Sequence, residues 1–189
     1  PATEVYAGTY EDGAYASDDE GDTWSARNLF EQRLAASAVD SEGRVFVGYA
    51  HLFRSENQGA DWMDLSWTDG ELVRDIAVDG LDRLFVVTSG GIYRSDDHGD
   101  TATSVVGDLP AGQPQLLAAG GPDNDIYLYQ SGDIRGVYRS TDGGVSWTAA
   151  GLEGEYVADL AIGPQGTLLA VVGWSGVFIS TDRGATWTN

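Results

Sequence analysis

The chain has 189 residues, enough for one domain with a sizeable core, and a formal charge of −20 from 30 acidic and 10 basic residues. All ten basic residues are arginines, and lysine is absent. Such an acidic surface repels phosphate groups, so binding to nucleic acid or to anionic membrane surfaces is disfavoured. The sequence has no cysteine, which excludes disulfides and thiolate metal sites, and no apolar run approaches the ~18 residues that membrane insertion requires.

Short strands are predicted in pairs, five times along the chain, because β-branched and aromatic residues gather between turn residues. In chain order the pairs are 4–7 with 13–16, 44–47 with 51–54, 83–86 with 91–94, 125–128 with 136–139, and 167–170 with 176–179. A further strand precedes every pair except the first, and these strands are centred on Ala38, Ala77, Ala118 and Ala161. The small central residue is typical of an innermost strand that is crowded by its neighbours.

An eight-residue motif, S-x-[DN]-x-G-x-x-W, follows each strand pair, and successive motifs start 38, 40, 45 and 40 residues apart. The Asp or Asn binds amides of its own turn, the Gly provides a positive φ, the Ser ties the loop to its strand, and the Trp covers the hairpin. Only Ala102 departs from the motif, where Trp is expected, so we expect the third hairpin to be less well covered. The motif residues are Ser17, Asp19, Gly21, Trp24, Ser55, Asn57, Gly59, Trp62, Ser95, Asp97, Gly99, Ser140, Asp142, Gly144, Trp147, Ser180, Asp182, Gly184 and Trp187.

This motif resembles the Asp-box, or bacterial neuraminidase repeat (BNR), of families that include sialidases, sortilin-type receptors, xyloglucan-type endoglucanases and photosystem assembly factors. The resemblance spans nearly the whole chain and implies an all-β fold: a β-propeller of four-stranded antiparallel blades with five Asp-box repeats of about 40 residues. We place the blades at about 1–28, 33–67, 72–107, 114–150 and 155–189 of a single domain, 1–189, with no helix. The first blade lacks an inner strand before Val5.

The missing inner strand leaves the completeness of the ring open. The chain is interpreted equally well as a fragment of a longer propeller, as a propeller completed by self-association or additional blades, or as a stand-alone five-bladed ring. An engineered array is a further alternative, although the unequal spacing of the repeats favours natural ancestry.

Acidic composition also bears on the environment of the protein. Aspartate outnumbers glutamate by 21 to 9, and with the absence of lysine this resembles halophilic proteins, in which salt screens self-repulsion. An acidic secreted domain that carries its charge for solubility is the alternative. The sequence begins at Pro1, as a processed mature form or an excised piece does, and we expect a secreted or extracytoplasmic protein.

The Asp-box residues are predicted to be structural, because the resemblance places their turns on the face away from the usual site of these families. The opposite face gathers variable turns, where we expect a carbohydrate or protein ligand. Candidate binding residues there are Tyr10, Tyr49, His51, Arg135 and Trp174. His51 replaces the Gly of the other four units, but no second His or Cys accompanies it, so a solvated histidine is favoured and no metal site is predicted.

Two carboxylates, Asp75 and Asp159, occupy equivalent positions near the start of inner strands, where they are candidates for the acid and base of a glycosidase. In so acidic a chain, such a pair also arises by chance. The Arg-Ile-Pro signature of sialidases is absent, and Arg54, Arg94 and Arg139 repeat just before the boxes, as packing residues do. We therefore expect a non-catalytic carbohydrate- or protein-binding or scaffold module without a cofactor, and keep a glycoside hydrolase as the alternative.

Overall fold

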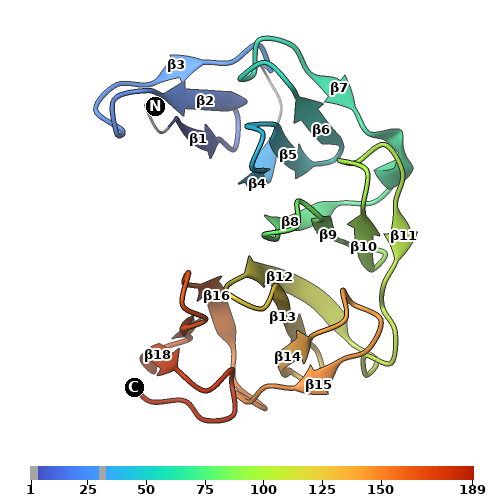
Figure 1. The fold of residues 1–189 in the computed structure, drawn as a ribbon, viewed down its shortest axis with the longest axis vertical. Helices are drawn as coiled ribbons and strands as arrows, with labels where there is room; N and C mark the ends of the chain where they lie inside the picture. Colours follow the sequence, from blue (N-terminus) through green and yellow to red (C-terminus); the bar gives the residue numbers. More distant parts are fainter. Residues whose placement is uncertain (1–3, 30–32) are drawn as a thin grey trace.

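The computed structural model describes residues 4–29 and 33–189, which form five small antiparallel sheets that follow one another around an arc (Figure 1). Each sheet is one blade, numbered in chain order, and the all-β prediction is confirmed; Pro1 and the predicted start of the first blade lie outside the described residues. The strands are β1 (Val5–Gly8), β2 (Ala14–Ser17) and β3 (Ser25–Ala26) in blade 1; β4 (Leu34–Val39), β5 (Val45–Tyr49), β6 (Leu52–Ser55) and β7 (Met63–Asp64) in blade 2; β8 (Val73–Val78), β9 (Leu84–Thr88), β10 (Ile92–Ser95) and β11 (Thr103–Ser104) in blade 3; β12 (Gln113–Gly120), β13 (Asp125–Ser131), β14 (Gly136–Ser140) and β15 (Thr148–Ala149) in blade 4; and β16 (Val157–Ile162), β17 (Leu168–Val172) and β18 (Gly176–Ser180) in blade 5.

Strand order is the same in blades 2, 3 and 4: the innermost strand comes first, and each later strand pairs antiparallel with the one before. The innermost strands β4, β8, β12 and β16 pack one against the next along the inside of the arc (Figure 1). Blade 1 begins at the second strand, because β1 pairs only with β2 among the described residues, so the predicted lack of an inner strand is confirmed. Blade 5 corrects the four-stranded prediction: its outer strand is a single bridge between Ile179 and Thr188, because outer strands are only two residues long and one lost pairing removes them.

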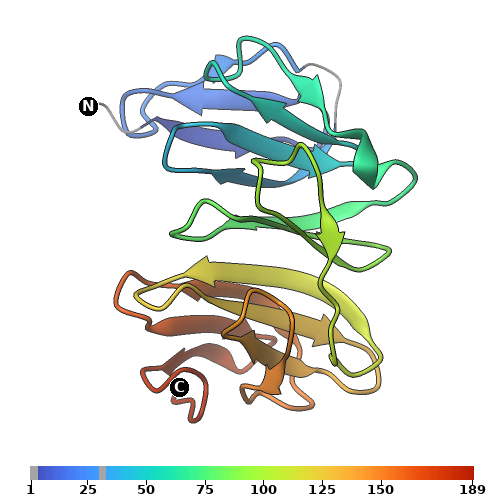
Figure 2. The same ribbon diagram turned by 45° about the vertical axis from the view of Figure 1, so that its right-hand side comes forward.

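The hydrophobic core consists of layers between neighbouring blades, which lie stacked along the arc in Figure 2. The second strands of the three interior blades, β5, β9 and β13, are buried on both faces, and in β9 every residue is buried. Phe46, Phe85 and Tyr127 share one repeat position, and each is fully buried against the following blade. Burying a side chain of that size contributes about 2 kcal/mol, so each blade is stabilised mainly by its neighbours.

The two end blades each lack a neighbour on one side among the described residues. Leu169 of blade 5 occupies the position of those buried aromatic residues, yet 42% of it is exposed, together with Val177 and Ile179 on the same face. In blade 1, Trp24 is 43% exposed, whereas Trp147 of blade 4 is buried against blade 3. Both ends of the arc therefore present apolar surface that the interior blades bury.

A short 3-10 helix, η1 (Ser66–Thr68), follows β7, where the sequence pattern predicts no helix. Its Trp67 donates from Nε1 to the carbonyl oxygen of Gly99 (2.8 Å), so an indole of blade 2 contacts the third Asp-box hairpin, which has Ala102 in place of its own Trp. A neighbouring linker therefore places a ring beside that hairpin, a cavity of about 420 Å³ is lined there by Leu65, Trp67, Gly99 and Asp100, and the poorer cover of the hairpin stays a prediction. No helix in the described part of the chain is long and apolar enough to cross a membrane.

Candidate functional site

The Asp-box loops share one hydrogen-bond pattern, which the loop of blade 3 illustrates. Ser95 Oγ accepts from the backbone N–H of Gly99 (2.7 Å) and donates to Asp97 Oδ1 (2.7 Å), which also accepts from the N–H of Thr101 (2.9 Å). The Thr101 hydroxyl donates to the other oxygen of Asp97, and these donors lower the pKa of Asp97 to about 2. The motif side chains therefore bind their own loop, as a structural role requires.

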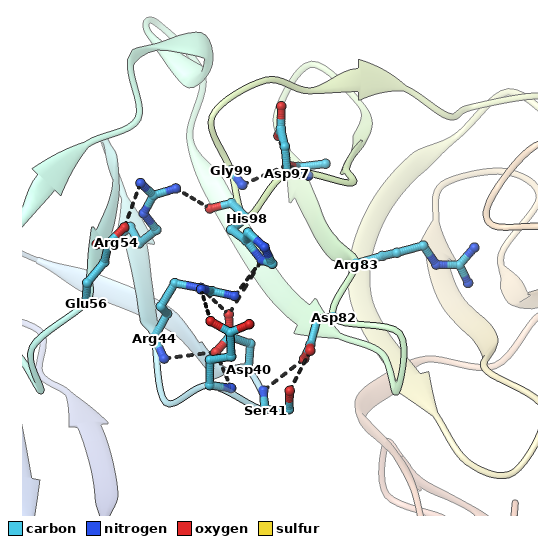
Figure 3. A network of polar contacts seen from close by, with 12 residues as sticks. Asp40, Ser41, Arg44, Arg54, Glu56, Asp82, Arg83, Asp97, His98 and Gly99 are labelled. Atoms are coloured by element: carbon cyan, nitrogen blue, oxygen red, sulfur yellow. Dashed lines mark hydrogen bonds and ion pairs between the residues drawn. The ribbon is translucent and has the colours of Figure 1, made fainter.

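Side chains of blade 2 fasten the Asp-box loop of blade 3 (Figure 3). Arg54 donates from Nη1 to the carbonyl oxygen of His98 and to Asp100 (2.7 Å each), and Arg44 donates to Nδ1 of His98 (2.6 Å). Arg94 donates in the same way to a carbonyl oxygen in the box loop of blade 4. These contacts agree with the predicted packing role of the repeated arginines and make the box face, the side that carries the Asp-box loops, a network of contacts between blades.

The opposite side, called here the loop face, carries a cavity of about 450 Å³ where the innermost strands begin. We call this cavity the axial pocket. Each innermost strand has a register shift at this level, and a bulge of this kind turns its extra side chain away from regular pairing. Four blades thus each deliver one bulge residue to the pocket wall: Ala35, Arg74, Gln115 and Ala158.

Aromatic and polar side chains share the wall of the axial pocket. Arg74 donates from Nη1 to Oε1 of Gln115 (2.7 Å), and its Nε is buried without a partner among the described residues. Tyr49 and the exposed Tyr156 contribute rings to the wall, and Tyr129, which is buried in the core, meets Tyr156 edge to face with centroids 6.5 Å apart. No carboxylate belongs to the part of the wall that the structure describes. Such a wall can stack against a ring-shaped or planar ligand group and hydrogen-bond to its polar atoms.

Arg33 joins two of the predicted binding residues. Its guanidinium lies 3.8 Å from the ring centroid of Tyr10 and 5.2 Å from that of Tyr49, and Nη1 donates to the Tyr49 hydroxyl (3.4 Å). The structure therefore brings Tyr10 and Tyr49 together through a cation that no sequence pattern singles out. Arg33 has no motif around it, and only the folded turns place it between the two rings.

The other predicted binding residues lie apart from the axial pocket. Trp174 is fully exposed at the turn between β17 and β18. Arg135 donates from Nε to the carbonyl oxygen of Gly132 (3.4 Å) within the turn between β13 and β14. His51 lies at the turn between β5 and β6, with Nδ1 3.1 Å from Oδ2 of Asp64. None of these three belongs to the pocket wall.

The two candidate catalytic carboxylates bind the backbone. Asp75 Oδ2 accepts from the N–H of Leu117 (2.7 Å) and Oδ1 from that of Ile76 (2.9 Å), so this side chain links the innermost strands of blades 3 and 4. Burial raises the pKa of Asp75 to about 6, with a smaller contribution from the charge of Asp159, while the two backbone donors oppose the shift. Asp159 accepts from the N–H of Leu160 (2.9 Å). Neither carboxylate belongs to the described wall of the axial pocket, and catalysis by this pair stays a prediction.

The comparison with protein families confirms the repeat. Residues 138–149 and 178–189 match the BNR/Asp-box repeat, and both segments contain the end of a third strand and the box that follows it. No curated protein matches the sequence significantly.

Solved structures share the fold at low sequence identity. An ancestral GH74 enzyme is 21% identical over 98% of this chain and 29% of its own, with a TM-score of 0.77. The GH74 xyloglucanase from Xanthomonas campestris is 21% identical over 98% of this chain and 36% of its own, with a TM-score of 0.73. YCF48 bound to D1 peptide is 18% identical over 100% of this chain and 65% of its own, with a TM-score of 0.69. The chain spans less than two thirds of each of these three proteins, and the likeness establishes the β-propeller fold.

Proposed function

We propose that this chain, a β-propeller that carries BNR/Asp-box repeats, is a non-catalytic module that binds a carbohydrate or a protein segment in the axial pocket of its loop face. The observation that carries the proposal is the pocket wall, where three tyrosines, one arginine and one glutamine occur without a carboxylate among the described residues. Stacking rings and hydrogen-bond donors suit binding, whereas hydrolysis of a glycoside requires paired carboxylates.

The similar structures support binding on this fold without selecting one ligand for this chain. One of them is a xyloglucanase, and another holds a D1 peptide. A sugar ring and an extended peptide both pack against exposed tyrosines and both accept hydrogen bonds from an arginine. Arg74, with its unpartnered Nε, is the donor that we expect a ligand to engage.

Binding is tested by screening the protein against a glycan array and a peptide library. We expect Tyr49→Ala and Tyr156→Ala each to weaken binding of a hit by about fivefold to tenfold, because a stacked aromatic ring contributes about 1 to 1.4 kcal/mol. Val145→Ala is the matched control, because Val145 is exposed in the Asp-box loop of blade 4, on the opposite face. Hits that tolerate both tyrosine substitutions would contradict a site in the axial pocket.

A glycoside hydrolase is the second candidate function, and the raised pKa of Asp75 favours it. A pKa of about 6 lies in the range of a general acid. Both oxygens of Asp75 are engaged by backbone donors, however, which supports the structural role. A panel of chromogenic glycosides separates the two candidates: we expect no turnover, and turnover that Asp75→Asn abolishes would overturn the non-catalytic proposal.

Self-association or contact with additional blades is proposed from the exposed apolar ends of the arc. Leu169, Val177 and Ile179 form one such face on blade 5. We expect Ile179→Glu to lower the molar mass measured by light scattering, and a monomeric wild-type protein would contradict self-association.

Salt adaptation stays a proposal that rests on composition, and an extracytoplasmic location stays a proposal as well. A lysine-free chain with a charge of −20 is expected to gain stability as salt screens its self-repulsion. Equal free energies of unfolding at low and high potassium chloride would contradict salt adaptation.

A further inference from the structure

Because the blades are repeats, a residue that differs from its equivalents in the other blades can be identified within the chain itself. Two such unusual residues lie close together in blade 2. His51 stands where the other blades have glycine: Gly13, Gly91, Gly136 and Gly176. Asp64, the last residue of β7, pairs with Phe53 at a position where blades 1, 3 and 4 have small residues: Ala26, Ser104 and Ala149. The Asp-box scaffold therefore requires neither the imidazole nor the carboxylate.

A third polar side chain reaches the same place from the linker after β7. This linker forms η1, the one helical turn in the described part of the chain, and Asp69 directly follows it. The turn of η1 thus places the Asp69 carboxylate near His51, in the turn between β5 and β6. The two departures from the repeat, His51 and Asp64, therefore meet a third polar side chain, Asp69, on the loop face.

The three side chains are close enough to share a metal ion. His51 Nδ1 lies 3.1 Å from Asp64 Oδ2 and 3.9 Å from Asp69 Oδ1, and all three ligand atoms lie within 4.8 Å of one another. Ligands that hold zinc at about 2.1 Å lie roughly 3.0 to 3.4 Å apart, so small rotations of exposed side chains complete the geometry. The Phe53 ring packs near the imidazole, with centroids 5.9 Å apart, and limits its rotation.

The carboxylates of Asp64 and Asp69 make no hydrogen bond to the backbone in the described part of the chain. Among the described residues, Asp64 and Asp69 have His51 as their side-chain partner and accept no backbone N–H. The box carboxylates differ, because Asp97 accepts from a backbone N–H and two hydroxyls of its own loop. Oxygen atoms without another donor are available to a cation.

We propose that His51, Asp64 and Asp69 bind one divalent first-row transition-metal ion, with Zn²⁺ or Co²⁺ as the probe. Imidazole nitrogen favours such ions, whereas Ca²⁺ takes six to eight oxygen ligands. Three protein ligands leave at least one coordination position open to water or to a ligand. The site lies outside the wall of the axial pocket and does not rest on the proposed binding function.

Isothermal titration with ZnCl₂ and the visible absorption of Co²⁺ test the site, on protein without a histidine tag. We expect one ion per chain for the wild type, and a loss of affinity of at least about tenfold for His51→Gly and for Asp69→Asn. The glycine variant restores the residue of the other four blades, so we expect it to fold. Asp133→Asn is the matched control, because Asp133 is an exposed acid in the equivalent turn of blade 4, and it should leave binding unchanged.

The outcomes separate a metal site from general acidity. Equal binding by the wild type and His51→Gly, or displacement of Zn²⁺ by equimolar Ca²⁺, would show unspecific attraction to an acidic surface and overturn the proposal. Absence of heat and of a Co²⁺ spectrum would overturn it as well, and would leave His51 and Asp64 as neighbouring side chains without a shared ion.

Discussion

The box face and the loop face are built from the same strands but differ in how far the blades agree. On the box face, the Ser side chain accepts from the N–H of the box Gly in every loop, and beside Ala102, where the Trp is missing, Trp67 of the neighbouring linker donates to Gly99. On the loop face, equivalent bulge positions hold three residue types: alanine in blades 2 and 5 (Ala35 and Ala158), Arg74 in blade 3 and Gln115 in blade 4. Agreement among repeats therefore marks the scaffold, and divergence marks the surface on which binding sites form.

The largest expected loss of stability comes from adding a side chain to a closely packed glycine of an Asp-box loop. Gly144 has a φ of +88°, and a Cβ there lies 2.9 Å from the Cβ of Val105 in the preceding blade. We expect Gly144→Ala to lower the free energy of unfolding by about 3 kcal/mol, because backbone strain and overpacking add. Gly43→Ala is the matched control with a φ of +82° and open space, and it should cost about 1 kcal/mol. Equal losses in urea denaturation would show that packing between blades does not contribute.

Asp75 and the box aspartates have pKa values shifted in opposite directions, and each shift makes the free energy of unfolding depend on pH. The pKa of Asp75 is raised to about 6, so its contribution is fully present below pH 4 and is lost as the pH rises through 6. We expect stability to fall by about 2 kcal/mol between pH 4.5 and 7.5 from this group. Urea denaturation across this range should show the slope, and Asp75→Asn should remove it; a slope that survives in the variant would contradict the assignment.

The box aspartates act in the opposite direction at lower pH. The pKa of Asp97 is lowered to about 2, so its contribution is present above pH 4 and is lost as the pH falls toward 2. Asp97→Asn copies Asn57 of blade 2, whose Oδ1 accepts from the N–H of Asp61 (2.9 Å) in the same way. We expect this variant to fold and to lose less stability in acid than the wild type.

Substitution of Trp67 tests whether this side chain of the blade 2 linker stabilises the third Asp-box hairpin. Its indole is half-buried and donates to Gly99, so we expect Trp67→Ala to cost about 2 kcal/mol of unfolding free energy. Trp67→Phe keeps a ring without the hydrogen bond and should cost about half as much. Thermal unfolding of both variants measures the difference, and an unchanged stability of Trp67→Ala would leave the third hairpin without its proposed cover.

The smallest expected change in the free energy of unfolding is that for substitution of Trp174. The side chain is fully exposed on the loop face, so Trp174→Ala should change the free energy of unfolding by less than about 0.5 kcal/mol. Loss of ligand binding at unchanged stability would make Trp174 a stacking platform. Loss of stability would instead place it in the scaffold, against the division between the two faces.

Much of the blade plan was predictable from the sequence, because its main contacts are local. Ser140 and Asp142 bind N–H groups only four residues further along the chain, so the motif carries its own geometry. The order of strands in the blades and the missing inner strand before Val5 follow from the same repeats. The prediction misses η1, because a single helical turn has too few residues to show a periodicity.

The candidate sites were predictable only in part. Tyr49 was expected on the loop face and lines the axial pocket there, but its partner Arg33 carries no sequence signal. His51 departs from the glycine of the other blades, yet its neighbours Asp64 and Asp69 lie 13 and 18 residues further along the chain. A comparison of every repeat position, including the outer strand, is the signal that identifies Asp64.

The sequence by itself determined the repeat, the order of strands in each blade and the structural role expected of the boxes, because hydrogen bonds within a short loop depend on neighbouring residues alone. Tertiary structure decided which side chains meet across blades. Arg74 with Gln115, Trp67 with Gly99, and Asp75 with Leu117 join residues 32 to 42 positions apart, and their contacts depend on how the sheets pack. Packing of one blade on the next, which no local pattern encodes, is what creates the pocket.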